Sequence, residues 1–223
     1  MTGREMIIFI LENHLEDEEI IQDGKIAGFL TVEEVVVLRR ALTAVGNMVG
    51  FVLSRPQTQY PRLHKRSENV CVFPDIIRRI NQIVDDEGGV KDTATPELLT
   101  IRRAIRQHEG QVAKRLQQVL ANAKKAGIVD AEAMISMRDG RAVIPVSAAN
   151  KRKLNGFIQD ESATGRTFYI EPVEVVELNN RLKELEYAER REVVRILTLF
   201  TDLVRQDIES VARSGEFVAT IDM

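Results

Sequence analysis

Residues 134–186 read MISMRDGRAVIPVSAANKRKLNGFIQDESATGRTFYIEPVEVVELNNRLKELE and lie between two long stretches with a helical apolar pattern. A short alternating segment leads into Asp139-Gly140, a dipeptide that favours a two-residue hairpin turn, and then into an apolar run at 141–146. Two more short apolar runs, 156–158 and 167–170, are separated by a cluster of turn-forming residues. The pattern predicts a small antiparallel sheet of three or four strands.

A long helix is predicted on each side of this sheet. The first begins at Pro96, because Thr95 can cap it and proline suits the first helical position, and Gly127 can end it. The second begins at Pro172 and continues to about residue 211, with apolar residues three and four positions apart. Since both helices adjoin the same small sheet, the chain must return beside its outgoing path, which predicts an antiparallel pair.

The residues before position 95 predict a helical body. Thr31-Val32-Glu33-Glu34 has the pattern of a capping box, and apolar residues at helical spacing follow to about Ser54. The other predicted elements of this body are a helix at 74–84, two short helices at 6–15 and 18–29, and a loop or a short turn of helix at 56–69.

The predicted fold class is mainly α with a small antiparallel β-sheet: a helical core plus a long antiparallel two-helix lever that carries a β tip. The lever denotes the two long helices, and the β tip denotes the sheet between them. The predicted boundaries are 1–95 for the helical core, 96–127 for the first lever helix, 128–171 for the β tip, 172–212 for the second lever helix, and 213–223 for a linker, in which the extended pattern at 217–221 allows a strand or a linker.

Composition limits the classes of partner. The chain has 223 residues, a formal net charge of -3, 29% charged residues and 5% aromatic residues. A length of this order is enough to bury a sizeable core in one large or two small domains. The slightly acidic balance argues against a wholly basic nucleic-acid module, although a local basic patch is compatible with it.

The sequence shows no recognisable targeting signal, and this leaves the cytoplasm as the expected location. Cys71 is the single cysteine, so no internal disulfide can form, and the N-terminal residues do not have the pattern of a secretory signal. No continuous apolar stretch approaches the roughly 20 residues that cross a bilayer. We therefore expect a cytoplasmic location and no membrane partner.

Several strings in the chain resemble one family. RDGRAVIPV at 138–146, GFIQDESATGRTFYIEP at 156–172 and VVELNNRLKELE at 175–186 are similar to the region before the ATPase in the type-two MutS family, bacterial relatives of the mismatch-recognition protein MutS. A weaker similarity runs through DGKIAGFLTVEEVVVLRRAL and the acidic turn at 84–90. The resemblance covers roughly residues 20–212.

The resemblance implies a place and a function for this region. It corresponds to the core and lever of a MutS-like protein, with a small β element where MutS carries a larger DNA-gripping clamp. Family members carry an ATPase domain after the lever, which uses ATP and Mg²⁺, and a C-terminal Smr-type endonuclease domain, so the chain is expected to be an interior part. The resemblance further implies homodimers and binding of branched or mismatched DNA to suppress recombination, or of ribosomal RNA in stalled-ribosome rescue.

Catalytic motifs are not found in the sequence. A P-loop places glycines before a Lys-Ser/Thr pair so that backbone amides hold phosphates, and no G-x-x-x-x-G-K-[ST] string occurs. His14, His64, His108 and Cys71 have no partner at metal-ligand spacing, and the acidic turn at 85–89 does not match a calcium loop. We expect no enzymatic activity, no metal and no cofactor in this chain.

A cluster of cations lies on or beside the predicted β tip. Interspersed acidic residues at Asp139, Asp160 and Glu161 leave a local excess of positive charge that could neutralise nucleic-acid phosphates. The alternative is a solvated face that keeps edge strands from pairing with other molecules. The candidate nucleic-acid-binding residues are Arg138, Arg141, Lys151, Arg152, Lys153 and Arg166.

Two further features have a structural alternative. Asn179-Asn180 lies inside the second predicted helix, although asparagine has a low helix propensity. This favours the interpretation that the two amides form hydrogen bonds to the base of the sheet, and Glu171 and Glu177 could do the same. A basic row on the first lever helix is typical of a solvent-facing surface, unless it forms a continuous stripe. Its members are Arg102, Arg103, Arg106, Lys114, Arg115, Lys124 and Lys125.

The sequence therefore predicts a non-catalytic arm that binds DNA (branched or duplex) or ribosomal RNA and couples this binding to ATP hydrolysis elsewhere in the parent protein. The alternative from another class is a protein-interaction or dimerisation module, in which the helices pair with a second copy. Exposed apolar residues on the helix at 173–211 would favour that alternative.

Overall fold

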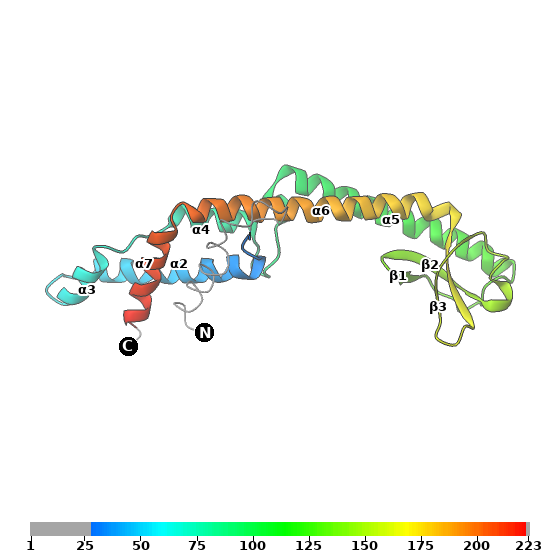
Figure 1. Ribbon diagram of the computed structural model, residues 1–223, viewed down its shortest axis with the longest axis horizontal. Helices are drawn as coiled ribbons and strands as arrows, with labels where there is room; N and C mark the ends of the chain where they lie inside the picture. Colours follow the sequence, from blue (N-terminus) through cyan, green and yellow to red (C-terminus); the bar gives the residue numbers. More distant parts are fainter. Residues whose placement is uncertain (1–27, 222–223) are drawn as a thin grey trace. The chain divides into compact units, whose positions relative to one another are not determined.

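The computed structural model describes residues 28–221, which form two compact units. Unit 1 comprises the described residues up to Leu98 together with those from Arg191 onward, and unit 2 comprises Leu99–Arg190. Helices α5 (Pro96–Lys125) and α6 (Val173–Arg205) each contribute residues to both units (Figure 1). The helices predicted at 6–15 and at most of 18–29 lie outside the described residues.

Unit 1 is helical, as the sequence predicted. Thr31 caps α2 with a complete capping box: its hydroxyl accepts from the Glu34 backbone N–H, and the Glu34 carboxylate accepts from the Thr31 N–H at 2.7 Å. The loop region at 56–69 contains the short helix that was one of its two predicted forms. Besides parts of α5 and α6, the elements are α2 (Val32–Leu53), α3 (Pro61–Ser67), α4 (Pro74–Ile83), η2 (Asp92–Ala94) and α7 (Ile208–Ile221).

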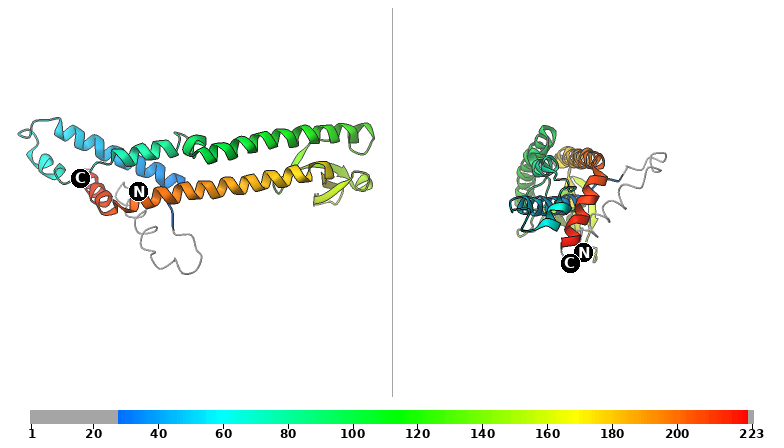
Figure 2. Two further views of the ribbon diagram at one scale, coloured as in Figure 1. Left: turned by 90° about the horizontal axis from the view of Figure 1, so that it is seen from above. Right: turned by 90° about the vertical axis from the view of Figure 1, so that its left-hand side faces the viewer.

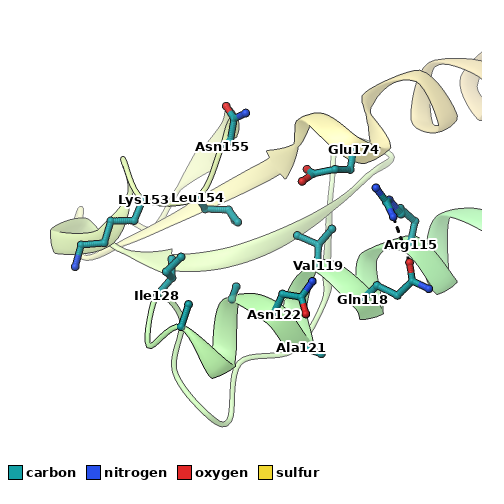
Figure 3. Close-up of a pocket in the computed structure, with 12 residues that line it drawn as sticks. Arg115, Gln118, Val119, Ala121, Asn122, Ile128, Lys153, Leu154, Asn155 and Glu174 are labelled. Carbon is teal, nitrogen blue, oxygen red and sulfur yellow. Dashed lines mark hydrogen bonds between the residues drawn. The ribbon is translucent and has the colours of Figure 1, made fainter.

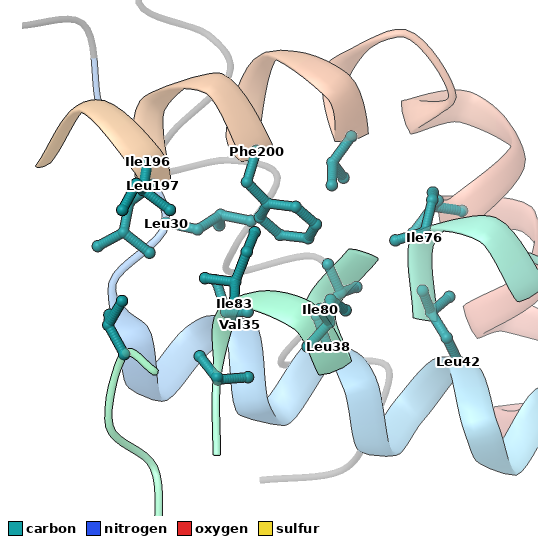
Figure 4. Close-up of a cluster of buried hydrophobic side chains, with 14 of the residues drawn as sticks. Leu30, Val35, Leu38, Leu42, Ile76, Ile80, Ile83, Ile196, Leu197 and Phe200 are labelled. Carbon is teal, nitrogen blue, oxygen red and sulfur yellow. The ribbon is translucent and has the colours of Figure 1, made fainter. Parts of the chain in front are cut away.

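The core of unit 1 lies between α2, α4 and α6. Phe200 of α6 is buried among side chains of these helices, including Ile80 and Ile83 of α4 and Val35 of α2 (Figure 4). Periodic apolar residues on one face of each helix account for this arrangement. Its fully buried members include Val35, Leu38, Leu42, Ile80, Ile83, Leu98 and Phe200.

Helix α2 corrects one expectation from the sequence. It is long and apolar enough, by length and composition alone, to cross a membrane, although no such stretch was anticipated. A core helix of a globular unit passes the same test, and six apolar residues of α2 are buried in unit 1. Core packing therefore accounts for these six residues, whereas Phe51 and Leu53 near the end of α2 are exposed.

The end of the second lever helix differs from the prediction. Helix α6 ends at Arg205, a turn follows at 206–207, and α7 occupies the segment predicted to be a linker or strand. In the turn the Asp207 N–H donates to the Val204 carbonyl at 3.1 Å, and the Asp207 carbonyl accepts from the Ser210 and Val211 N–H groups at the start of α7. Phe217 then packs with Val45 and Val49 of α2, which the alternation at 217–221 did not reveal.

The junction between η2 and α5 contains a buried carboxylate. Thr95 caps α5 by accepting from the Leu98 N–H at 3.1 Å, and its hydroxyl donates to Glu192 Oε1 at 2.7 Å. Arg195 donates to both oxygens of Glu192, each at 2.7 Å. The Arg195 hydrogen bonds, helped by Thr95, hold the pKa of Glu192 below its ordinary value of 4.5 against the raising effect of burial.

This lowered pKa predicts a pH dependence for unit 1. A group with a depressed folded-state pKa stabilises the fold above its ordinary pKa, and this contribution is lost as pH falls through the lower, folded-state value. Glu192→Gln should therefore lower the stability of unit 1 at neutral pH and flatten its decline below about pH 4.5. Urea unfolding at several pH values measures both effects. Glu87→Gln, at an exposed carboxylate, is the control, and equal pH profiles for the two variants would contradict the prediction.

Unit 2 carries the predicted antiparallel sheet, in the strand order β1-β2-β4-β3. Asp139 and Gly140 have φ values of 47° and 71°, the left-handed conformations that a two-residue hairpin turn requires, and this turn joins β1 to β2. The four-strand sheet and the turn are confirmed. The elements are β1 (Ser136–Arg138), β2 (Arg141–Ser147), η3 (Ala148–Asn150), β3 (Gly156–Glu161) and β4 (Thr167–Pro172).

One face of the sheet packs on α5. Leu116 of α5 is fully buried with Ile144 and Ile170, which are register partners on β2 and β4, and Val175 of α6 joins the same cluster. At the other end of unit 2, Arg102 of α5 donates to Glu189 of α6 at 2.7 Å. Within unit 2 the α5 and α6 segments therefore lie side by side and antiparallel (Figure 2).

Gly156 begins β3 at a place with no room for a side chain. A Cβ at this position would lie 2.3 Å from the Glu171 carbonyl oxygen and 2.6 Å from Ile170 Cγ2. Gly156→Ala should therefore separate β3 from β4 and destabilise unit 2 by about 2 kcal/mol. Gly110→Ala is the matched control, because a Cβ there meets nothing within 4 Å. It should stabilise α5 by about 0.5–1 kcal/mol in thermal unfolding; a Gly156→Ala variant as stable as the native chain would refute this packing.

Candidate nucleic-acid interface

The structure divides the six predicted cations into two groups. Arg138 and Arg141 stand on the β1–β2 hairpin, and each forms an ion pair with a carboxylate of the sheet. Lys151, Arg152, Lys153 and Arg166 form no ion pair with a described residue. The two groups therefore differ in their surroundings.

Arg141 belongs to a polar network centred on Glu171. Only 1% of Glu171 is exposed, and its Oε1 accepts from Arg141 Nη1 and from Asn179 Nδ2, both at 2.7 Å. Gln159 of β3 donates to Oε2 at 2.5 Å, and Arg141 also donates to Asn180 Oδ1 at 2.8 Å. The network joins β2, β3, β4 and α6, because burying a carboxylate requires donors on all its sides.

This network assigns a structural role to residues that the sequence singled out. The prediction that Asn179-Asn180 bonds the base of the sheet is confirmed, since Asn179 also donates to the Ala142 carbonyl at 3.4 Å. Glu171 serves the same end, as expected. Arg141 is one of the predicted nucleic-acid-binding residues. Two of its guanidinium nitrogens donate hydrogen bonds within the protein, to Glu171 and to Asn180.

Arg138 is also engaged within the sheet. Its Nε lies 2.9 Å from Asp160 Oδ2, and its guanidinium carbon lies 3.7 Å from the centre of the Tyr169 ring. A cation on an aromatic face is attracted to the ring electrons. Arg138 therefore couples β1 to β3 and β4, and its charge is largely balanced by Asp160.

The second group lies at the other end of β2. Ser147, the last residue of β2, pairs with Thr167, and the Ala148 N–H donates to the Arg166 carbonyl at 2.9 Å. This register brings Arg166 beside the turn that carries the three consecutive cations at 151–153. Arg152, Lys153 and Arg166 are exposed, whereas the Lys151 ammonium lies 4.0 Å from the centre of the Phe168 ring.

A hollow of about 640 Å³ lies beside this group. Its floor is apolar, with Val119, Ile128 and Leu154, and its rim is polar, with Lys153 and Arg115 among the rim residues (Figure 3). One cation of the β tip, Lys153, and one of the basic row on α5, Arg115, therefore border the same hollow, at its opposite ends (Figure 3). Amides add hydrogen-bonding groups and Glu174 a negative charge; the amide residues are Gln118, Asn122 and Asn155.

The basic row on α5 has mixed roles. Arg102 pairs with Glu189, and Lys124 donates to the Ala131 carbonyl at 2.6 Å. The other five members are exposed, and three of these recur every eleven residues, which is close to three helical turns and places those three on one side of the helix. They are about 16 Å apart, so they do not form a continuous stripe. These members are Arg103, Lys114 and Lys125.

Metal ligation finds no support within residues 28–221, where no group of three His, Cys, Asp or Glu side chains could hold an ion. His64 lies 3.0 Å from the Arg55 carbonyl and His108 lies 3.0 Å from the Ala104 carbonyl, so both have local hydrogen-bond partners. His14 lies outside the described residues. In the acidic turn, Asp85 accepts from the Glu87 and Gly89 N–H groups, as a solvated turn would.

Comparison with curated proteins identifies relatives with one name. The chain is 31% identical over 204 residues to a protein from Geobacillus sp. (strain WCH70) named endonuclease MutS2, covering 91% of this chain and 26% of the relative. A protein of the same name from Enterococcus faecalis is 35% identical over 166 residues, covering 74% and 21% respectively. A third, from Halalkalibacterium halodurans, is 29% identical over 218 residues, covering 96% and 27%.

The chain thus spans about a quarter of the length of these relatives. No family model matches it.

Proposed function

Because this chain belongs to the MutS2 family of MutS-like proteins, we propose that it is a non-catalytic core and lever region that binds nucleic acid through its β tip. Its binding residues in this proposal are Arg152, Lys153 and Arg166, with Lys151 beside them. Arg138 and Arg141 hold the tip together instead of contacting phosphate.

One observation carries this proposal: the exposed cations at the end of β2 have no carboxylate partner among the described residues. A cation that is already paired within a protein gains little binding free energy from a phosphate. An unpaired cation that contacts a phosphate releases the counterions that had condensed on the nucleic acid. Phosphate contacts of this kind fix position without reading sequence. The hollow beside Lys153 offers an apolar floor and amides that could receive an unstacked base.

The polar network explains how such contact could be transmitted. Glu171 ties three strands to the first turns of α6 through Gln159, Arg141 and Asn179. In this proposal a force on the tip passes through these contacts to the part of α6 that lies in unit 2. In this proposal α6 and α5 carry that movement toward an ATPase domain of the kind found in the family, which supplies the ATP and Mg²⁺ chemistry.

We assign no catalytic step to this chain. The relatives are named endonucleases, and the sequence contains no P-loop for ATP hydrolysis. Nuclease and ATPase activities of the parent protein would belong to its other domains. The proposed location is the cytoplasm, and the proposed target is branched or mismatched DNA, in suppression of recombination, or ribosomal RNA on a stalled ribosome.

Fluorescence anisotropy with branched DNA, duplex DNA and ribosomal RNA at two salt concentrations tests the binding and separates these targets. We expect affinity for at least one of them to fall steeply as salt rises. The preferred target should bind more tightly than the others at both concentrations. Equal, salt-independent signals for all three would remove the proposed role of the β tip.

A second candidate function is protein association, favoured by exposed apolar residues on α6. Leu199 and Leu203 are adjacent on one helical face in unit 1, and they are 54% and 38% exposed. Such a pair could contact a second copy of this chain, in line with the expected homodimer. Light scattering would give twice the monomer mass for the native chain, and Leu199→Glu should return it to the monomer; a monomeric native chain would exclude this function.

A further inference from the structure

A second basic surface, separate from the β tip, lies in unit 1. Residues 35–67 contain no Asp or Glu, although 34 of the 223 residues in the chain are acidic. Arg39 is engaged by Asp86 and Asn81, at 3.6 and 3.3 Å. The remaining cations of this stretch are exposed and form no ion pair with a described residue; they are Arg40, Arg55, Arg62, Lys65 and Arg66.

Helix α3 gathers three of these cations. Arg62, Lys65 and Arg66 are three and four positions apart, so they share one face of the helix. Together with Leu63 and Asn69 they line a surface hollow of about 740 Å³. We name this surface, formed by Arg62, Lys65 and Arg66, the α3 patch.

Helix stability does not explain all of these charges. Cations in the last turn of a helix favour its dipole, which suits Lys65 and Arg66. Arg62 instead stands in the first turn, where a cation opposes the dipole, and that turn contains no acidic residue.

Exposed aromatic rings lie close to the α3 patch in the sequence. Tyr60 immediately precedes α3 and is 37% exposed. Phe51 is 53% exposed, and the guanidinium carbon of Arg55 lies 5.0 Å from the centre of its ring. An acidic peptide needs only positive charge, whereas the unpaired cations of α3, with the exposed ring of Tyr60 directly before them in the chain, suit phosphates joined to stacking bases.

We propose that the α3 patch, with Tyr60, binds the backbone of a single-stranded nucleic acid. This inference extends the proposed function to a second surface and rests on different residues from the β tip. Three cations on one short helix can meet neighbouring phosphates, and the adjacent ring can stack on a base. The binding is independent of sequence, because phosphates and ring stacking do not identify a base.

The test compares triple variants with equal changes in net charge, using anisotropy of a labelled oligothymidylate. Arg62→Gln, Lys65→Gln and Arg66→Gln together remove the α3 patch. Arg78→Gln, Arg191→Gln and Arg213→Gln together remove three exposed cations of unit 1 that lie outside residues 35–67. Each phosphate contact contributes about 0.7 to the salt slope of a single strand, so the first variant should bind about 100-fold more weakly at about 0.1 M salt and the second nearly as the native chain.

Further arms separate this inference from the proposed function. Tyr60→Ala should weaken oligothymidylate binding severalfold without changing its salt slope, because it removes stacking alone. The variant Arg152→Gln, Lys153→Gln and Arg166→Gln, measured in parallel, reports on the β tip. Loss in the tip variant with native binding in the α3 variant would overturn this inference and leave the proposed function intact. The reverse result would support the inference, while the role of the tip is decided by its own titration with branched DNA, duplex DNA and ribosomal RNA.

Two other polyanions test the identity of the partner. Polyglutamate and vesicles containing phosphatidylserine carry negative charge without bases. If either binds the α3 patch as tightly as oligothymidylate does, the surface recognises an acidic protein or a lipid headgroup, and the assignment to nucleic acid is overturned. We expect both to bind at least tenfold more weakly than the oligonucleotide.

Discussion

Replacing Phe200 with alanine is expected to destabilise unit 1 by about 4 kcal/mol, because removing a buried aromatic ring from a packed core forfeits burial and leaves a cavity. Only 2% of Phe200 is exposed, and its ring lies among side chains of α2, α4 and α6 (Figure 4). Urea unfolding measures this loss of stability when it is monitored through the hydrogen exchange of backbone amides in unit 1.

Leu199 gives the matched control, because it is the neighbouring residue on the same helix and 54% of it is exposed. At concentrations where the chain is a monomer, so that no contact of Leu199 with a second copy contributes, Leu199→Ala should change the stability of unit 1 by no more than about 0.5 kcal/mol, as surface substitutions do. A similar loss in both variants would show that the helix face assigned to the core is wrong.

Glu171→Gln is expected to destabilise unit 2 by about 3 kcal/mol. The substitution breaks the buried ion pair between Glu171 and Arg141. The charge of Arg141, whose side chain is only 21% exposed, is then left without compensation. An amide also offers a single acceptor oxygen where Glu171 now accepts from three side chains. Hydrogen exchange in β2, β3 and β4 should rise together, because the network joins all three strands.

Glu161→Gln serves as the control for this change. Glu161 is exposed on β3 and forms no ion pair with a described residue. We expect its loss to alter stability by less than about 0.5 kcal/mol. The prediction would fail if Glu171→Gln left strand exchange unchanged, and a second substitution, Arg141→Met, should recover part of the lost stability by removing the unpaired charge.

Local signals predicted most of the fold. The capping box at Thr31, the cap at Thr95 and the Asp139-Gly140 turn all depend on residues within a few positions, and the structure has all three. The antiparallel course of α5 and α6 in unit 2 followed from the sheet between them. The amides of Asn179-Asn180 were traceable because they oppose helix propensity.

The roles of the cations could not be predicted in the same way. Arg138 and Asp160 are 22 positions apart, and Arg141 and Glu171 are 30 apart, so sequence spacing gave no sign that they pair. Proximity along the chain grouped all six cations as one cluster, whereas strand register separates two of them from the rest. The hollow that Lys153 and Arg115 border at opposite ends depends on packing between α5 and the sheet, which no local pattern encodes.

The same limit applies to the end of the chain and to the α3 patch. The extended apolar pattern at 217–221 masked a helix whose Phe217 is buried against α2. The α3 patch can be recognised only when three observations are combined: residues 35–67 contain no acidic residue, the cations of the patch are exposed, and Arg39 is paired with Asp86. Both features required knowledge of which side chains face solvent.

The salt dependence of nucleic-acid binding by the β tip tests the central claim most directly. The native chain, the triple variant Arg152→Gln, Lys153→Gln and Arg166→Gln, and a control with Arg181→Gln, Lys183→Gln and Arg190→Gln on α6 would be titrated against the preferred target over a range of salt. If the tip cations contact phosphates, the logarithmic salt slope of the tip variant on a duplex should fall by about 3, while the control keeps the native slope. Equal slopes for all three proteins would contradict the account.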